Sequence, residues 1–150
     1  MRHAPKPRTG AAAIEFAVIC PVLLLFIVGL LVGGLGIFRY QEIAAVAREC
    51  SRWASVHGGQ YQQETGNAAA TAQDVYNTII LPQSAALDLS QLTYSVTWNT
   101  SNNPYHTVIT NGQLVPVTNT VTVSISYQWI PEAYFGGGTL TSTSVTPMSY

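Results

Sequence analysis

The sequence predicts an α+β protein, with a long N-terminal transmembrane helix followed by a short helix and a small antiparallel β-sheet domain. Three observations lead to this prediction. A charge-free apolar run occupies residues 16–38, a helical apolar pattern continues to about residue 57, and the C-terminal half alternates apolar with polar residues. The chain accordingly divides into a basic tail at 1–10, a long helix at 11–57 and an α+β domain at 58–150.

The composition limits the class of protein. Hydrophobic residues make up 47% of the 150 residues and charged residues only 9%, whereas an ordinary soluble domain has about 25% charged residues. The net charge is −1, and no Lys or Arg follows Arg52. Because nucleic-acid binding depends on cationic side chains at phosphates, nucleic acid is excluded as a partner of the C-terminal two-thirds.

The apolar run from Phe16 to Phe38 predicts a membrane anchor, with the lipid bilayer as its partner. At about 1.5 Å per residue it is long enough for a hydrocarbon core of about 30 Å. A cleavable secretory signal would be shorter and would end in a small-x-small site, which this run lacks. A lipoprotein signal at Cys20 is disfavoured by the bulky Ile19 before it.

The flanking charges predict the orientation of this anchor. The N-terminal tail carries three basic residues and no acid, which favours a cytoplasmic N-terminus and a periplasmic or extracellular domain. Three arginines on the far side weaken this asymmetry, although Glu42 and Glu49 accompany them.

Glu15 lies at the edge of the apolar run, where a carboxylate is costly. One interpretation places it at headgroup depth near the first helical turn, where the helix dipole favours an anion. The other requires a free amine at Ala11. Since Glu15 is four residues further on, it would share that helix face and could pair with its own or a neighbour's ammonium group.

The N-terminal motif resembles a known family. A basic leader ends at Gly10, small residues follow, Glu15-Phe16-Ala comes next, and Pro21 lies within the apolar helix. This string resembles the TadE-like family, minor pseudopilins of the Flp/Tad (tight adherence) type IV pilus system. The later stretch Ala47–Ala54 keeps the family's two arginines, aromatic residue and alanine, with Cys-Ser in place of Gly-Ala.

The resemblance implies a maturation step and a role. A membrane-embedded prepilin peptidase would cut between Gly10 and Ala11, and Glu15, with Phe16 and Pro21 in the same motif, would set the register of subunits during assembly. The implied protein is a structural component of the bacterial inner membrane or of the pilus, required for pilus assembly. Its implied partners are the peptidase and other pilin and pseudopilin subunits of the Tad system.

Beyond the membrane, apolar residues recur at steps of three and four on one helix face. They are Ile43, Val46, Ala47, Cys50, Trp53, Ala54 and His57. This stripe could pack other pilin-like helices, with Arg48, Arg52 and Trp53 as the helix interface, or it could pack only against the protein's own domain.

The C-terminal region predicts the remaining elements. The polar segment 60–66 predicts a loop, and residues 67–80 predict a helix that Pro82 ends. Alternating residues at 92–98 and 121–129, with a possible edge strand at 140–145, predict an antiparallel sheet. Asn111-Gly112 between apolar runs predicts a hairpin within 108–115.

No pattern in the sequence indicates catalysis, a metal site or a cofactor. His3, His57 and His106 have no partner at ligand spacing, and no serine lies in a nucleophile motif. Cys20 and Cys50 would lie about 45 Å apart on one helix, too far for a bridge. Cys50 is then either buried in the stripe or available to bridge a second chain.

Two other classes of protein compete with a pilus subunit. An uncleaved single-span membrane protein could carry its exported domain as a binding module, with Glu15 as an interface charge. A secreted hydrolase with a retained anchor lacks any recognisable site.

Overall fold

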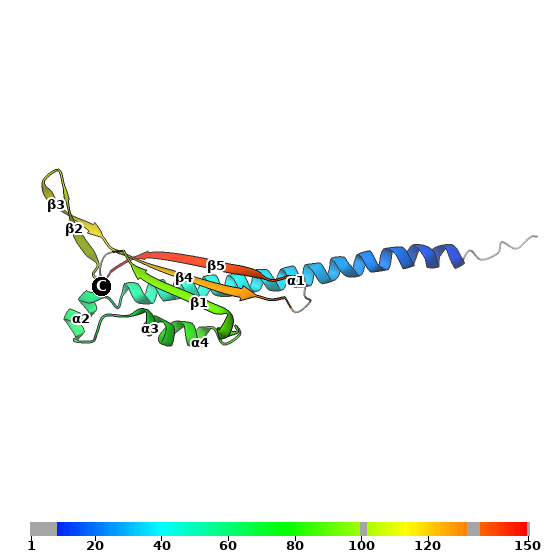
Figure 1. The fold of residues 1–150 in the computed structure, drawn as a ribbon, viewed down its shortest axis with the longest axis horizontal. Helices are drawn as coiled ribbons and strands as arrows, with labels where there is room; N and C mark the ends of the chain where they lie inside the picture. The colour runs from blue at the N-terminus through cyan, green and yellow to red at the C-terminus, as the bar shows by residue number, and fades with distance from the viewer. Residues whose placement is uncertain (1–8, 100–101, 132–135, 150) are drawn as a thin grey trace, which may run out of the picture.

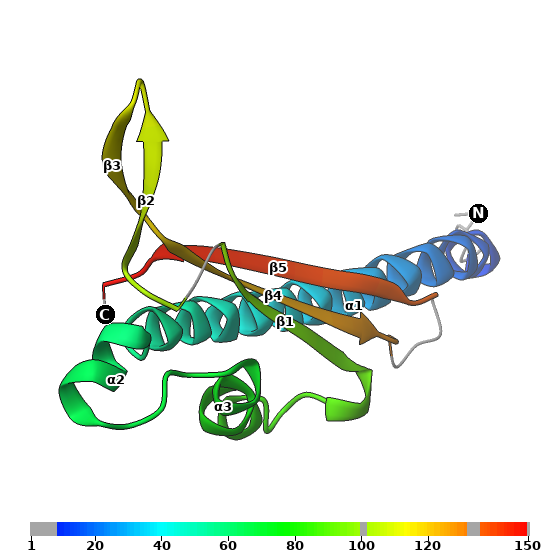
Figure 2. The same ribbon diagram turned by 60° about the vertical axis from the view of Figure 1, so that its left-hand side comes forward.

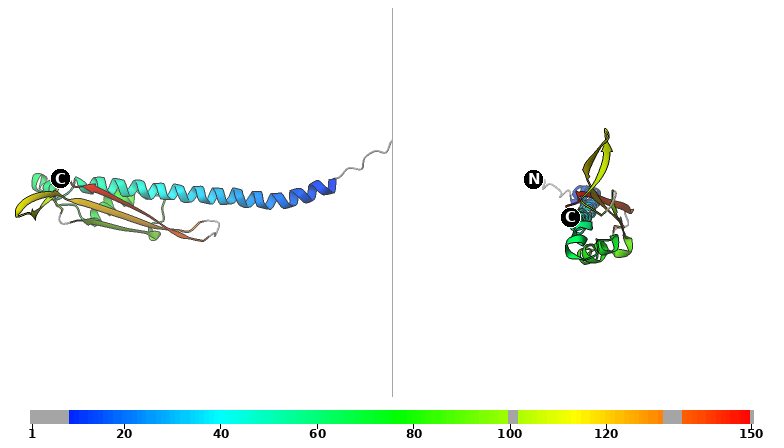
Figure 3. Two further views of the ribbon diagram at one scale, coloured as in Figure 1. Left: turned by 90° about the horizontal axis from the view of Figure 1, so that it is seen from above. Right: turned by 90° about the vertical axis from the view of Figure 1, so that its left-hand side faces the viewer.

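The fold is dominated by one long helix, against whose C-terminal half the rest of the chain packs (Figure 1). The structure is a computed structural model and describes residues 9–99, 102–131 and 136–149. Helix α1 spans Thr9–Ser55, so it begins two residues before the predicted start and ends two before the predicted end. It continues through Pro21, and Figure 3 shows only a shallow bend in its N-terminal part.

The chain between α1 and the first strand contains four short helical segments. They are α2 (Gly59–Thr65), α3 (Ala72–Val75), the π-helical η1 (Tyr76–Ile80) and α4 (Leu81–Gln83). The predicted loop at 60–66 is therefore wrong, because α2 forms there and ends at Gly66 in the left-handed conformation (φ 76°). A 3₁₀ turn, η2 (Leu89–Gln91), leads into the sheet.

The helix predicted at 67–80 begins later, at Ala72, because Thr71 caps it. The Thr71 hydroxyl and amide both donate to the Asp74 carboxylate, at 2.7 and 2.9 Å. These bonds hold the pKa of Asp74 below its usual value, the hydroxyl contributing most. The prediction that Pro82 ends this helix is wrong, because α4 continues through it to Gln83. Pro82 lacks the amide hydrogen for an α-helical bond, and the turn before it widens into the π-helix.

The strands form two separate antiparallel sheets rather than the single sheet predicted. The larger has the order β1-β4-β5, from β1 (Leu92–Trp98), β4 (Thr120–Trp129) and β5 (Gly138–Pro147). The smaller is a hairpin of β2 (Tyr105–Thr110) and β3 (Gln113–Thr118), which projects away from the body (Figure 2). Its turn is Asn111-Gly112, both at positive φ (53° and 79°), as the Asn-Gly pair predicted.

One core lies between the sheet, α1 and the α3–α4 segment. The central strand β4 turns alternate residues inward, and Val121, Val123 and Ile125 are fully buried. Opposite them lie Ile43, Ala47, Cys50 and Ala54 of α1 and Val75 and Ile80 of the short helices. The predicted α+β class is confirmed.

Hydroxyl groups also join α1 to the edge strand β5. Ser51 is 1% exposed, and its Oγ lies 2.8 Å from Ser144 Oγ and accepts a hydrogen bond of 2.9 Å from Thr146. Ser51 in turn donates to the carbonyl of Arg48 at 3.0 Å. Because a buried hydroxyl needs partners, these bonds set the register of β5 along the helix.

Candidate assembly surface

The N-terminal half of α1 is an apolar surface that the described part of the domain leaves largely exposed. Its large side chains are widely exposed, including Phe16 at 70% and Leu24 at 56%. Within the part of the chain that the structure describes, α1 is the one helix long and apolar enough to cross a membrane. None of its most apolar stretch is buried inside the protein, so this surface requires lipid or other helices to cover it.

The predicted processing and assembly residues all lie on this projecting half. Gly10 is in the first turn of α1, and a Cβ added there would meet no atom within 4 Å. Glu15 is exposed, and no hydrogen bond or ion pair links its carboxylate to another described residue. Phe16 and Pro21 are exposed on the same projecting segment. The domain therefore constrains none of these four residues.

Of the three residues predicted as a helix interface, two are exposed on α1 and the third is half-buried. Arg48 is exposed, and Arg52 forms an ion pair with Glu49 at 3.0 Å on the outer face of α1. Trp53 is half-buried and stacks on His57, with ring centroids 4.1 Å apart. The apolar stripe itself packs against the protein's own domain, which decides between the two alternatives that the sequence left open.

Two contacts where the domain meets the helix were not predicted from the sequence. Arg39 donates to the carbonyl of Ala86 at 2.6 Å and pairs with Glu42 at 3.2 Å. Trp129, at the end of β4, lies against Gly36, where an added Cβ would be only 2.9 Å from the indole Cη2. These contacts hold the α4–β1 connection and the end of β4 at the boundary between the covered and projecting halves of α1.

Cys50 is enclosed in the core, which favours the buried alternative over a bridge to a second chain. Its side chain is 0% exposed, and both cysteines are free thiols. Burial, assisted by the nearby Glu49 charge, raises the pKa of the Cys50 thiol to about 12. Cys50 thus serves packing, and Ser51 beside it serves the hydroxyl contacts to β5.

We predict that Cys50 resists alkylation in the folded protein, because the reactive species is the thiolate. A C20S variant in detergent micelles should react with a maleimide only after denaturation, measured as the mass increase with time. The C50S variant, which retains Cys20, reports on reagent access to the micelle. Full labelling of native C20S protein at neutral pH would contradict the burial of Cys50.

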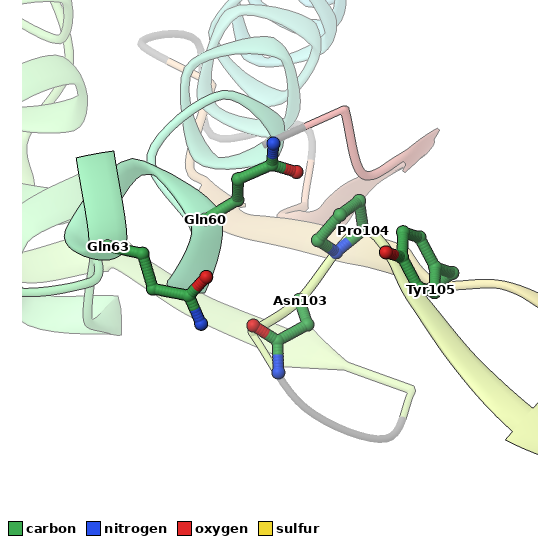
Figure 4. A pocket seen from close by; sticks show the side chains of 5 residues that line it. All are labelled: Gln60, Gln63, Asn103, Pro104 and Tyr105. Atoms are coloured by element: carbon green, nitrogen blue, oxygen red, sulfur yellow. The ribbon is translucent and has the colours of Figure 1, made fainter.

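Figure 4 shows a polar pocket beside α2. It lies between α2 and the start of β2, has a volume of about 280 Å³, and is lined by Gln60, Gln63, Asn103, Pro104 and Tyr105. The side chains are amides, one proline and one phenol. Within the described residues, no group of three or more His, Cys, Asp or Glu side chains could hold a metal ion.

Taken together, the fold and this surface define a small α+β domain carried on a single apolar helix that is compatible with membrane anchoring. Residues 10–52 match the sequence model of a protein family whose description is TadE-like protein. This match confirms the resemblance over α1 and associates the chain with the Tad pilus system. No curated protein and no solved structure shows a significant match.

Proposed function

We propose that this protein is a non-enzymatic minor pseudopilin, required for assembly of a Tad/Flp-type pilus. It is made as a precursor, and a prepilin peptidase removes residues 1–10 by cleavage between Gly10 and Ala11. It then lies in the bacterial inner membrane, with its N-terminus on the cytoplasmic side and its α+β domain outside, until it joins other subunits. Adhesion by the finished pilus would depend on it indirectly.

The observation that carries this proposal is the position of the family match. Residues 10–52 comprise the projecting half of α1 and the covered half up to Arg52. The segment with the motif is thus the segment that presents an unpartnered apolar surface. Within it, Glu15 is the one charge between Gly10 and Phe38, and no described residue neutralises it. An amine at Ala11 would supply the missing positive charge after cleavage.

The β2–β3 hairpin lies at the end of the molecule opposite to the projecting helix. Its exposed side chains support the proposal that the protein contacts other Tad-system subunits. Three of its large side chains are highly exposed: Tyr105 at 63%, Ile109 at 76% and Leu114 at 71%. Among the described residues, neither strand pairs along its outer edge, and an exposed apolar hairpin of this kind is typical of a surface that pairs with another chain.

The alternative is an uncleaved membrane-anchored binding module. It accounts for the same apolar helix and exposed hairpin, but it leaves Glu15 without a partner and gives the motif at Gly10 no role. The two proposals differ in whether the peptide bond between Gly10 and Ala11 is cleaved.

The intact mass of the membrane-purified protein shows whether that bond has been cleaved. We expect the loss of residues 1–10 in cells that contain the prepilin peptidase, and the full-length chain in cells that lack it. Intact mass is required because no Lys or Arg follows Arg52, so trypsin leaves the last two-thirds uncut. A full-length chain in both samples would contradict processing and favour the anchored binding module.

Gly10 provides a variant that separates recognition by the peptidase from folding. Since a Cβ at Gly10 would meet no other atom, substitution there should leave the domain unchanged. A G10D variant should remain full length in the presence of the peptidase, with an unchanged melting temperature. Normal processing of G10D would show that the peptidase cleaves at another position, or that it does not require Gly10.

A further inference from the structure

The end of the β-sheet nearest the N-terminus reaches back along the projecting helix (Figure 1). We call its described residues, Trp129–Pro131 and Gly136–Gly138, the proximal tip. Between this tip and α1 lies an open apolar groove with a volume of about 640 Å³. The helix contributes Leu25, Gly29, Val32 and Gly33 to its lining, and the sheet contributes Trp129, Pro131, the three glycines and Leu140.

The groove lies alongside the segment of α1 that would be in the bilayer. Trp129 contacts Gly36, which is within the charge-free run that ends at Phe38. At about 1.5 Å per residue, Gly33 lies about 5 Å and Leu25 about 17 Å further along the helix toward the N-terminus. If lipid surrounds this run, the groove is at the depth of the leaflet on the domain's side.

The side chains near Gly36 have the character of a membrane interface. Phe38 is 60% exposed and Tyr40 is 44% exposed, and exposed aromatic side chains are enriched at headgroup depth. The first charge of the helix beyond the run, Arg39, pairs with Glu42 on the same helix and donates to the Ala86 carbonyl of the domain. A lipid headgroup region at this level therefore meets aromatic and apolar groups.

The described part of the tip is apolar and partly exposed: Pro131 is buried and Trp129 is half-buried, whereas Ile130 is exposed. Ile130 is 64% exposed just after β4. The described tip residues are uncharged, and Glu132, the one charged residue of the sequence between Trp129 and Gly138, lies outside the described residues. An exposed isoleucine beside an apolar groove costs free energy in water and gains it in lipid.

We propose that the proximal tip is a lipid-contacting element. Trp129 and Ile130 enter the headgroup and upper acyl region, and acyl chains fill the groove between the tip and residues 25–33 of α1. The domain thus rests on the bilayer at two points, the helix and the tip, which fixes its tilt and rotation and directs the β2–β3 hairpin away from the surface. This inference rests on the membrane anchoring in the proposed function, but not on cleavage or on pilus assembly.

Tryptophan quenching by brominated lipids tests the proposal on the full chain. The protein has three tryptophans, Trp53, Trp98 and Trp129. A W53F/W98F variant leaves Trp129 alone and is reconstituted in phosphatidylcholine–phosphatidylglycerol vesicles. The bromines are placed either near the headgroup end or near the methyl end of the acyl chains. We expect strong quenching of Trp129, greater with the shallow bromines than with the deep ones.

Two further single-tryptophan proteins serve as controls. Trp98 lies at the opposite end of the sheet, paired with Val121, so a W53F/W129F variant should show no quenching. A W53F/W98F/W129F/F26W variant reports on the helix itself and should be quenched by the deep bromines. Quenching at position 26 without quenching of Trp129 would overturn the lipid contact while leaving the anchor intact. No quenching at either position would overturn both.

The contact can also be broken at one exposed residue. I130D should weaken the quenching of Trp129, whereas I109D, at the even more exposed Ile109 of the hairpin, should leave it unchanged. Both variants are surface changes, and equal melting temperatures would show that the domain remains folded. If Trp129 escapes the bromines but becomes shielded from acrylamide as protein density in the vesicles rises, a second copy of the chain occupies the groove, and the proposal is wrong.

Discussion

Replacement of Glu15 by glutamine is expected to abolish pilus assembly while leaving the protein folded, inserted and cleaved. Under the proposed function, the carboxylate of a subunit cleaved after Gly10 would pair with an N-terminal ammonium in a medium of low dielectric. Two unit charges about 4 Å apart at an effective dielectric constant of about 20 attract by about 4 kcal/mol, which corresponds to about a thousandfold in the incorporation of a subunit. The measurement is the amount of pilus sheared from cells that express E15Q in place of the native protein.

Glu15 suits this test because it contacts no part of the domain. Its side chain is exposed on the projecting half of α1, so E15Q should keep the native melting temperature and the native processed mass. E15D retains the charge with a shorter reach and should restore part of the assembly. Normal piliation of E15Q cells would remove the charge pair from the mechanism and favour Glu15 as a residue at headgroup depth.

Replacement of Gly36 by leucine is expected to detach the end of the sheet from the helix. A Cβ at this position would lie 2.9 Å from Cη2 and 3.0 Å from Cζ3 of Trp129, and the rigid indole cannot yield without moving β4. Overpacking of this type costs about 1–3 kcal/mol. For a domain of this size, each kcal/mol lowers the melting temperature by about 4–8 °C. Thermal unfolding of G36L in detergent, followed by tryptophan fluorescence, measures the loss.

Gly34 provides a matched control for this substitution. It lies in the same helix two residues away, and a Cβ there would meet nothing within 4 Å. Since leucine also favours the helix more than glycine does, G34L should melt at or above the native temperature. Equal melting of G36L and G34L would show that Trp129 does not depend on the space at Gly36.

The elements that depend on the local pattern of apolar and polar residues were predicted correctly from the sequence. The apolar run and the stripe from Ile43 to Ala54 predicted α1 nearly to its ends. Alternation at 92–98 and 121–129 matched β1 and β4, and Asn111-Gly112 placed the hairpin turn. Each of these signals lies within a few residues of the element that it predicts, so neighbours distant in sequence do not alter it.

Predictions from weaker local patterns were wrong where a particular hydrogen bond decides at which residue a helix begins or ends. The segment 60–66 is polar and was predicted as a loop, yet α2 forms there and Gly66 caps its end. The second helix starts at Ala72 rather than residue 67 because Thr71 and Asp74 cap each other. Its π-helical turn before Pro82 has no counterpart in apolar periodicity.

By itself the sequence determined the long apolar helix, the motif around Glu15 and the α+β class, because these follow from the order of neighbouring residues. Only the tertiary structure decided that the stripe packs on its own domain, that the hairpin forms a separate sheet, and that Trp129 lies against Gly36. These outcomes depend on strand pairing and packing between residues far apart in the chain. Apolar periodicity predicts that one face of a helix or strand is buried. Which other element covers that face depends on the free energy of the whole fold.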